Sequence, residues 1–165
     1  EQEAFAAYDS CLQWKDDNVM ALNNYAYYLS EKGVDLHKAE AMSYKTIKAE
    51  PNNGTYLDTY AWILFMEERY ADAKTYIDQA LKNRDSTADN STVLEHAGDI
   101  YYMNGMADES VDFWKKAYTG ENQTEVLAWK IKNRQYITEE ELKKRNASKQ
   151  KPAATKKSVR KGKKK

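Results

Sequence analysis

The stretch YLDTYAWILFMEERYADAKTYIDQAL, residues 56–81, decides the fold class of this chain. In its first half, apolar and small residues recur at i, i+3, i+4 and i+7, a spacing that places them on one face of a helix. They are Leu57, Tyr60, Ala61 and Leu64. The second half has helical spacing as well, at Ala73, Ile77, Ala80 and Leu81. Because each half carries a small residue, two helices can approach closely, and the stretch predicts a helical hairpin.

The same pattern occurs on both sides of this stretch. ALNNYAYYLSEKG begins at residue 21 and VLEHAGDIYYMNG begins at residue 93. The small residue recurs at Ala26, Ala61 and Gly98, at intervals of 35 and 37 residues. A second helix follows each time, marked by Ala39, Thr46 and Ile47 in the first unit and by Ser110, Trp114 and Ala117 in the third. Two helices in each period predict a repeat array.

The pattern resembles the tetratricopeptide repeat, a helix–turn–helix unit of about 34 residues. The resemblance covers about residues 1–122 and rests on the small close-approach residues, their aromatic or apolar partners and Pro51 at a repeat junction. LNNYAYYLSEKG and YLDTYAWIL are most similar to bacterial cell-envelope members of the family. The chain departs from the family where Ser110 replaces alanine, Glu68 replaces a turn glycine and Asp85 replaces proline. The resemblance implies an all-α, right-handed superhelical solenoid of antiparallel helix pairs.

The sequence predicts four sections. Residues 1–17 fit the second helix of a truncated preceding repeat, with Cys11 in its core, and residues 18–122 hold three repeats. Residues 123–145 are predicted to form a capping helix and a short charged helix, and residues 146–165 a disordered Lys-rich tail. The non-Met start and the half-repeat suggest the C-terminal portion of a longer array.

Two details concern residues 123–145. In the predicted capping helix, Val126, Leu127 and Ile131 share one face, and Lys130 is placed elsewhere. Thr138 and Glu141 have the spacing of a capping box, which predicts that the charged helix begins there and runs to about residue 145.

The net charge of zero hides an asymmetry. Residues 146–165 hold nine Lys/Arg and no Asp/Glu, so the rest of the chain has 17 basic and 26 acidic residues. The segment KPAATKK resembles a bipartite nuclear-import signal. The basic tail also suits electrostatic binding to nucleic acid or an anionic membrane, docking onto the acidic body, or solubilisation alone.

The composition argues against several function classes. One cysteine excludes an internal disulfide framework, and with only His37 and His96 beside it a Cys/His zinc site is not expected. No apolar run has the length of a membrane span. Glu95, His96 and Asp99 lie within one helical turn, but no Ser or Cys nucleophile, glycine-rich loop or paired metal ligands accompany them. The sequence therefore predicts no enzyme, no cofactor and no metal.

The resemblance implies a concave groove, lined by the first helix of each repeat, in which peptide ligands lie. Counting from the small residue of each repeat places fifteen side chains in that groove. They are Met20, Asn23, Asn24, Tyr27 and Ser30; Thr55, Asp58, Thr59, Trp62 and Phe65; and Thr92, Glu95, His96, Asp99 and Tyr102. Trp62 and Phe65 fall outside the core set of their own repeat, so they are predicted either to bind a ligand or to pack on a neighbouring segment.

The leading interpretation is a non-catalytic scaffold that holds a peptide or partner protein in this groove. The predicted site consists of Asn23, Asn24, Tyr27, Asp58, Trp62, Phe65, Glu95, His96, Asp99 and Tyr102. Since three of these are acidic, the ligand is expected to be neutral or basic, with apolar anchors. The alternatives are an electrostatic binder that acts through its tail, with the repeats as spacer, and the closing section of a larger repeat protein. By resemblance a bacterial periplasm or cell envelope is favoured, then cytoplasm, and the nucleus least.

Overall fold

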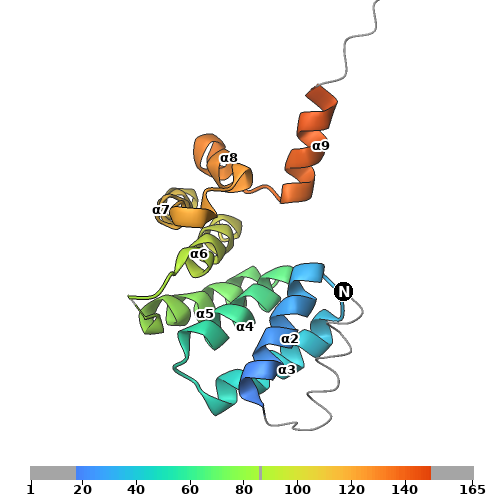
Figure 1. Ribbon diagram of the computed structural model, residues 1–165, viewed down its shortest axis with the longest axis vertical. Coiled ribbons are helices and arrows are strands. Elements are labelled where there is room, and N and C mark those ends of the chain that lie inside the picture. Colours follow the sequence, from blue (N-terminus) through green and yellow to red (C-terminus); the bar gives the residue numbers. More distant parts are fainter. Residues whose placement is uncertain (1–17, 86, 150–165) are drawn as a thin grey trace, which may run out of the picture.

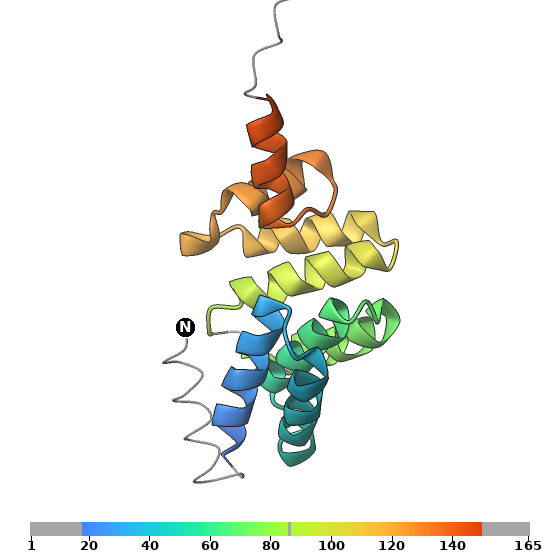
Figure 2. The ribbon, with the colours of Figure 1, turned by 90° about the vertical axis from the view of Figure 1, so that its right-hand side faces the viewer.

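Antiparallel helix pairs stacked one on another form the body of the molecule (Figures 1 and 2). The computed structural model describes residues 18–85 and 87–149 of the 165-residue chain. The pairs are α2 (Val19–Lys32) with α3 (Leu36–Ala49), α4 (Gly54–Met66) with α5 (Tyr70–Asn83), and α6 (Ser91–Met103) with α7 (Ala107–Ala117). A short 3-10 turn, η1 (Gly120–Asn122), leads to α8 (Glu125–Asn133) and α9 (Glu139–Lys149). The predicted all-α helical-repeat solenoid is confirmed.

Some of the sequence predictions concern residues outside the described ranges. The half-repeat at 1–17, the packing of Cys11 and the basic tail from residue 150 onward lie outside the described residues. Of the predicted tail, residues 146–149 belong to α9, which ends at Lys149 rather than at Arg145. Ion pairs at i,i+4 spacing, Glu139 with Lys143 and Glu140 with Lys144, stabilise this helix. Among the described helices, none is long and apolar enough to cross a membrane.

The turn inside each pair contains a residue in the left-handed region. The φ angles are 63° at Gly33, 62° at Glu68 and 79° at Gly105. Glycine adopts this conformation without steric cost, whereas a residue with a Cβ pays about 1 kcal/mol or more. Glu68 therefore occupies the glycine position of the family turn, and the departure seen in the sequence leaves the turn geometry unchanged.

Asparagine side chains fix the starts of two first helices. The Asn18 side chain accepts from the backbone N–H of Ala21, and that of Asn53 accepts from Thr55 and Tyr56. At the start of α6, the N–H of Ser91 donates to the Asp89 carboxylate at 2.9 Å.

The close-approach residues are at the centre of the core, as the repeat pattern predicts. Ala26 and Ala61 are fully buried, and Gly98 is buried. A Cβ on Gly98 would lie far inside van der Waals contact with the Trp114 indole, so α6 and α7 require glycine there. The small residues that characterise the second helix of each pair are buried too. Ala39, Ala73 and Ser110 are fully inaccessible.

The segment after the repeats packs on the last pair. Leu127 of α8 is fully buried in a cluster with Val111, Trp114 and Ala117 of α7. Lys130 is also buried, at 3 % exposure, so its predicted position away from the buried face is wrong. The reason is electrostatic, because α6 offers this ammonium group two carboxylates.

The last helix, α9, projects beyond the stack at the end where α8 lies (Figures 1 and 2). The predicted capping box is present at its start. The N–H of Thr138 donates to the Glu141 carboxylate, and the N–H of Glu141 donates to the Thr138 hydroxyl.

Candidate functional site

A cavity of about 630 Å³ lies between the first helices of the repeats and the C-terminal helices. Its repeat side comes from α2, α4 and α6, the helices predicted to line the groove. The opposite side comes from α8, α9 and the residues between them. Its apolar lining includes half-buried Trp62, Met66, Val126 and Tyr136.

The predicted site residues divide into two groups. Five of them line the cavity: Tyr27, Trp62, Glu95, His96 and Asp99. The other five do not. Asn23 and Asp58 are buried at 4 % and 6 % exposure, Asn24 is exposed outside the lining, Phe65 is buried, and Tyr102 packs against Trp114 with ring centroids 5.9 Å apart.

Phe65 belongs to the core, so its predicted position outside the core is wrong. The side chain is 5 % exposed and meets the rings of Tyr70 and Tyr136 edge-on, at 5.5 and 5.7 Å between centroids. Phe65 therefore packs on its own second helix and on the segment before α9. Of the two roles that the sequence left open for Phe65, the structure therefore shows packing on a neighbouring segment rather than exposure to a ligand.

Trp62 both packs and lines the cavity. Its ring stacks on Phe65 and on His96, at centroid distances of 4.8 and 4.0 Å. Its indole N–H donates to the Glu31 carboxylate at 2.7 Å, which ties α4 to α2. The half-buried ring is held in one orientation on the cavity wall, and a fixed aromatic surface is suited to binding because little entropy is lost on contact.

Below Trp62, a buried ion pair joins α4 to α6. His96 Nδ1 lies 3.0 and 3.2 Å from the two oxygens of Asp58, and both side chains are almost inaccessible. Burial alone would lower the pKa of His96. The charge of Asp58 and its hydrogen bond outweigh burial, and Asp99 and Glu31 add to the effect, so the pKa of His96 is raised.

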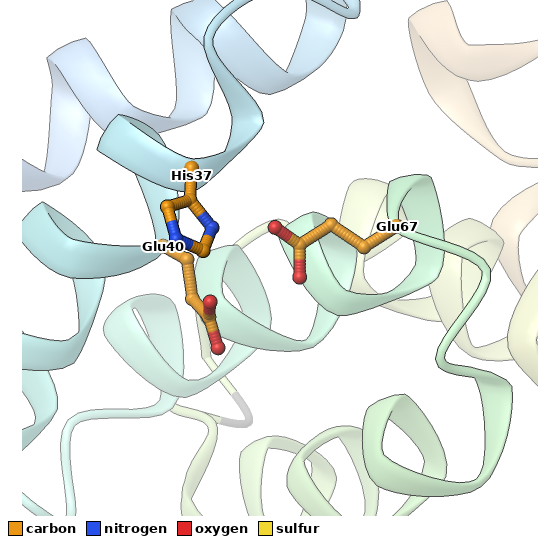
Figure 3. Close-up of side chains that lie close together, drawn as sticks. All are labelled: His37, Glu40 and Glu67. Atoms are coloured by element: carbon orange, nitrogen blue, oxygen red, sulfur yellow. The ribbon is translucent and has the colours of Figure 1, made fainter.

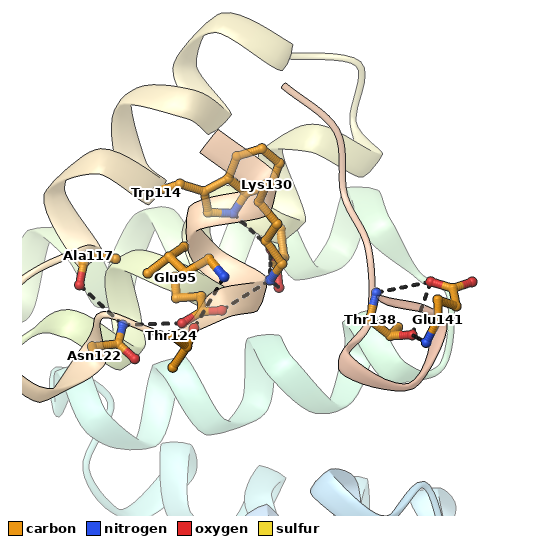
Figure 4. Close-up of polar contacts among 10 residues, drawn as sticks. Glu95, Trp114, Ala117, Asn122, Thr124, Lys130, Thr138 and Glu141 are labelled. Atoms are coloured by element: carbon orange, nitrogen blue, oxygen red, sulfur yellow. Dashed lines mark hydrogen bonds and ion pairs between the residues drawn. The ribbon is translucent and has the colours of Figure 1, made fainter. Parts of the chain in front are cut away.

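A second buried cluster joins α6 to α8 (Figure 4). Lys130 Nζ lies 2.8 Å from each oxygen of Asp99 and 3.1 Å from Glu95, and it lies 5.3 Å from the centre of the Tyr136 ring. The Trp114 indole N–H also donates to Asp99, at 2.8 Å. Burial raises the pKa of Asp99 against the opposite pull of Lys130. The carboxylates that α6 presents to the cavity thus have a cation of the chain beside them.

Two tyrosines of the cavity lie close enough to carboxylates for these charges to oppose their ionisation. Burial raises the pKa of Tyr27, and the charges of Glu31, Asp58 and Glu95 raise it further. Burial likewise raises the pKa of Tyr136, with Asp99 as the largest charge contribution. A phenol whose ionisation is opposed by several carboxylates reports an environment that favours cations.

Register within the repeats did not reveal the rest of the lining. Glu31 and Met66 lie one position beyond the last groove position counted in their repeats. Lys130, Tyr136 and Leu142 lie outside the repeats, so no repeat position could be assigned to them. The sequence offers one signal for the C-terminal part of the lining. Lys130 follows the apolar Leu127 by three positions, so both lie on the same side of the helix.

Outside the cavity, His37, Glu40 and Glu67 place one potential metal-ligand atom each within 4.8 Å of one another (Figure 3). Arg69 already occupies the two carboxylates, with Nη1 at 2.7 Å from Glu40 and 3.2 Å from Glu67. The hydrogen bond to Glu40 is the largest cause of the raised pKa of Arg69. Since the carboxylates have a cation of the chain between them, we assign this cluster to the packing of α3, α4 and α5.

No family model matches the chain. It is 35 % identical over 66 residues to a TPR repeat-containing protein of Pseudomonas aeruginosa. The match covers 40 % of this chain and 11 % of that protein, so the chain spans about a tenth of the length of its curated relative.

Three solved structures share the fold. The first TPR domain of human RPAP3 matches with a TM-score of 0.60 at 13 % identity, over 79 % of this chain and 96 % of that domain. The N-terminal domain of stress-induced protein-1 from C. elegans matches at 0.54 and 20 % identity, over 72 % and 94 % of the two chains. The TPR2AB domain of yeast Sti1, solved as a complex with pHSP90, matches at 0.53 and 23 % identity, over 81 % and 49 %.

Proposed function

The chain has the fold of a tetratricopeptide-repeat array, and on that premise we propose that it is a non-catalytic scaffold that binds a peptide or partner protein. The site is the cavity between the first helices of the repeats and α8–α9. The observation that carries this proposal is the cavity lining, where aromatic and apolar side chains are held rigidly beside carboxylates. The yeast Sti1 domain, solved with pHSP90, has the same fold and supports binding of a protein ligand.

The polar groups of the cavity support a structural rather than a catalytic role. His96 is paired with Asp58 and stacked under Trp62, and Asp99 and Glu95 are paired with Lys130. The ion pairs join neighbouring helices, and the His96 ring is covered by Trp62, so these groups contribute to holding the helices together.

The partner segment is neutral or basic and carries apolar side chains. Trp62, Met66 and Val126 provide apolar surface, and Glu31 and Glu125 add exposed carboxylates at the cavity. An acidic ligand would meet like charges in a partly desolvated site, which disfavours it.

Blocking the cavity tests this proposal. Thr92 lines the cavity and is exposed, so Thr92→Trp fills space without disturbing the core. Thr75 is an exposed threonine on α5, outside the lining, and Thr75→Trp is the matched control. We expect Thr92→Trp to weaken capture of partner proteins by about tenfold or more, with Thr75→Trp behaving as wild type.

The same measurement separates the alternative, in which the basic tail binds nucleic acid or an anionic membrane. Partners retained by Thr92→Trp but lost at high salt, or lost on deletion of residues 150–165, would contradict binding in the cavity and favour the tail.

A further inference from the structure

The carboxylates of the cavity differ in whether the chain supplies a cation for them. Asp99 and Glu95 have Lys130, and Glu139 has Lys143. Asp58, which lies buried behind the lining, has His96, and this pair is neutral when the imidazole is protonated and negative when it is not. None of these groups leaves a positive charge free in the cavity.

Glu125 of α8 accepts from the neutral amide of Asn146 and has no ion-pair partner among the described residues. At the α2 end, Glu31 is in the same position. It is exposed, lines the cavity and accepts the indole N–H of Trp62, which is a neutral donor. Within residues 18–85 and 87–149, no Lys or Arg lies within ion-pair distance of its carboxylate. Its charge nonetheless reaches the neighbouring groups, because it contributes to the raised pKa of both Tyr27 and His96.

Lys130 shows how this cavity accommodates an ammonium group. Its Nζ lies between carboxylates, with the rings of Tyr136 and Trp114 at 5.3 and 5.9 Å. The α2 end presents the same kinds of groups, namely the Glu31 carboxylate beside the aromatic side chains of Tyr27 and Trp62. The difference is that no Lys or Arg among residues 18–85 and 87–149 pairs with the carboxylate at this end.

We propose that the α2 end of the cavity, formed by Glu31, Tyr27 and Trp62, receives one lysine or arginine side chain of the bound partner segment. This inference rests on the proposed function and names the feature of the ligand that the site selects. The apolar stem of the side chain lies against Trp62 and Met66, and its charge lies at Glu31. Selection follows because an uncharged side chain leaves Glu31 without a counter-charge, and an acidic one is repelled.

A double-mutant cycle on the protein and a peptide tests the inference. The probes are labelled nonapeptides, acetylated and amidated so that their termini carry no charge, from a library that varies each position. The tightest lysine-containing peptide is then compared with its norleucine copy. Glu31→Gln is the protein variant, because its amide oxygen still accepts the Trp62 N–H. Glu109→Gln, an exposed glutamate on α7 outside the cavity, is the matched control.

We expect lysine or arginine to be enriched at one position of the peptides bound by the wild type. Replacing that lysine with norleucine should weaken binding about fivefold to the wild type and to Glu109→Gln, as for a partly exposed ion pair. It should have almost no effect on Glu31→Gln. An equal loss with Glu31→Gln, or bound peptides without a cationic preference, would overturn the inference and leave the proposed function standing. If neither the wild type nor any variant binds a peptide, the proposed function fails with it.

Discussion

Two buried carboxylates, Asp58 and Asp99, each join a first helix of a repeat to another helix of the stack, but their partners differ. Asp58 of α4 is paired with His96 of α6, and Asp99 of α6 is paired with Lys130 of α8. An imidazole loses its charge near neutral pH, whereas an ammonium group keeps it. The junction between the second and third repeats is therefore sensitive to pH, and the junction between the third repeat and α8 is held by a fixed charge.

The two pairs also face the cavity differently. His96 stacks on the cavity-lining ring of Trp62, so a change at this pair is transmitted to the proposed binding surface. Lys130 Nζ, in contrast, donates to three carboxylate oxygens, and the Trp114 indole N–H donates to Asp99 as well. The second pair is the stronger structural link, and its loss should have the larger effect.

The largest effect is expected for Lys130→Met. The variant leaves Asp99, at 3 % exposure, without a counter-charge, and breaking a buried pair from one side costs about 3 to 5 kcal/mol. The measurement is the free energy of unfolding in urea. Lys132→Met, an exposed lysine on the same helix, is the matched control and should change stability by about 0.5 kcal/mol or less. Equal stability of the two variants would refute the assigned role of the Asp99–Lys130 pair.

A middle-sized effect is expected for Gly98→Ala, which disturbs the contact between α6 and α7, next to the Asp99–Lys130 pair. The new methyl group would overlap the indole of Trp114, and this side chain is fully buried and cannot move aside. Overpacking of this kind costs about 1 to 3 kcal/mol, measured as a shift in the urea midpoint. The hydrogen bond from Trp114 to Asp99 should weaken with it.

A double-mutant cycle identifies the cause of that effect. The atoms that meet the new methyl are Cδ1, Nε1 and Cγ of Trp114, all of which alanine lacks. The cost of Gly98→Ala should therefore be smaller in a Trp114→Ala background than in the wild type. Additive costs would mean that the strain lies elsewhere in the α6–α7 contact.

The repeat core could be predicted from the sequence more fully than the site. Ala26, Ala61 and Gly98 recur at a regular spacing, so the helix pairs and their core follow from local pattern. Glu68 could be recognised as a departure from the turn glycine because the register fixed its position.

The site was only partly predictable, for physical reasons. Tyr27, Trp62 and His96 lie on first helices, and the repeat register carries them to the cavity. Phe65 lies on the same helix, but Tyr136 covers it, and nothing local to the repeat indicates that segment. Lys130 is a lysine on an amphipathic helix, which is normally solvated. Its burial depends on Asp99 and Glu95, more than thirty residues earlier in the chain.

The smallest effect is expected at the other pair, on changing the pH rather than the residue. The pKa of His96 is raised above its ordinary value of 6.5. The stabilisation by the charged pair is therefore fully present below pH 6.5 and is lost as the pH rises through the raised value. The loss is partial, because a neutral imidazole still shares a hydrogen bond with Asp58. The urea midpoint of the wild type should fall as the pH rises beyond that value.

A variant isolates this histidine from the other titrating groups. Asp99 has a raised pKa too, so it also lowers stability as the pH rises, but its change begins from an ordinary value of 3.8. His96→Gln keeps a polar partner for Asp58 and has no charge to lose, so the gap in stability between wild type and variant should narrow as the pH rises. A gap that stays constant with pH would mean that folding does not shift the pKa of His96. In that case the Asp58–His96 pair would not make its junction sensitive to pH, and its contrast with the Asp99–Lys130 pair would reduce to the number of hydrogen bonds that each carboxylate accepts.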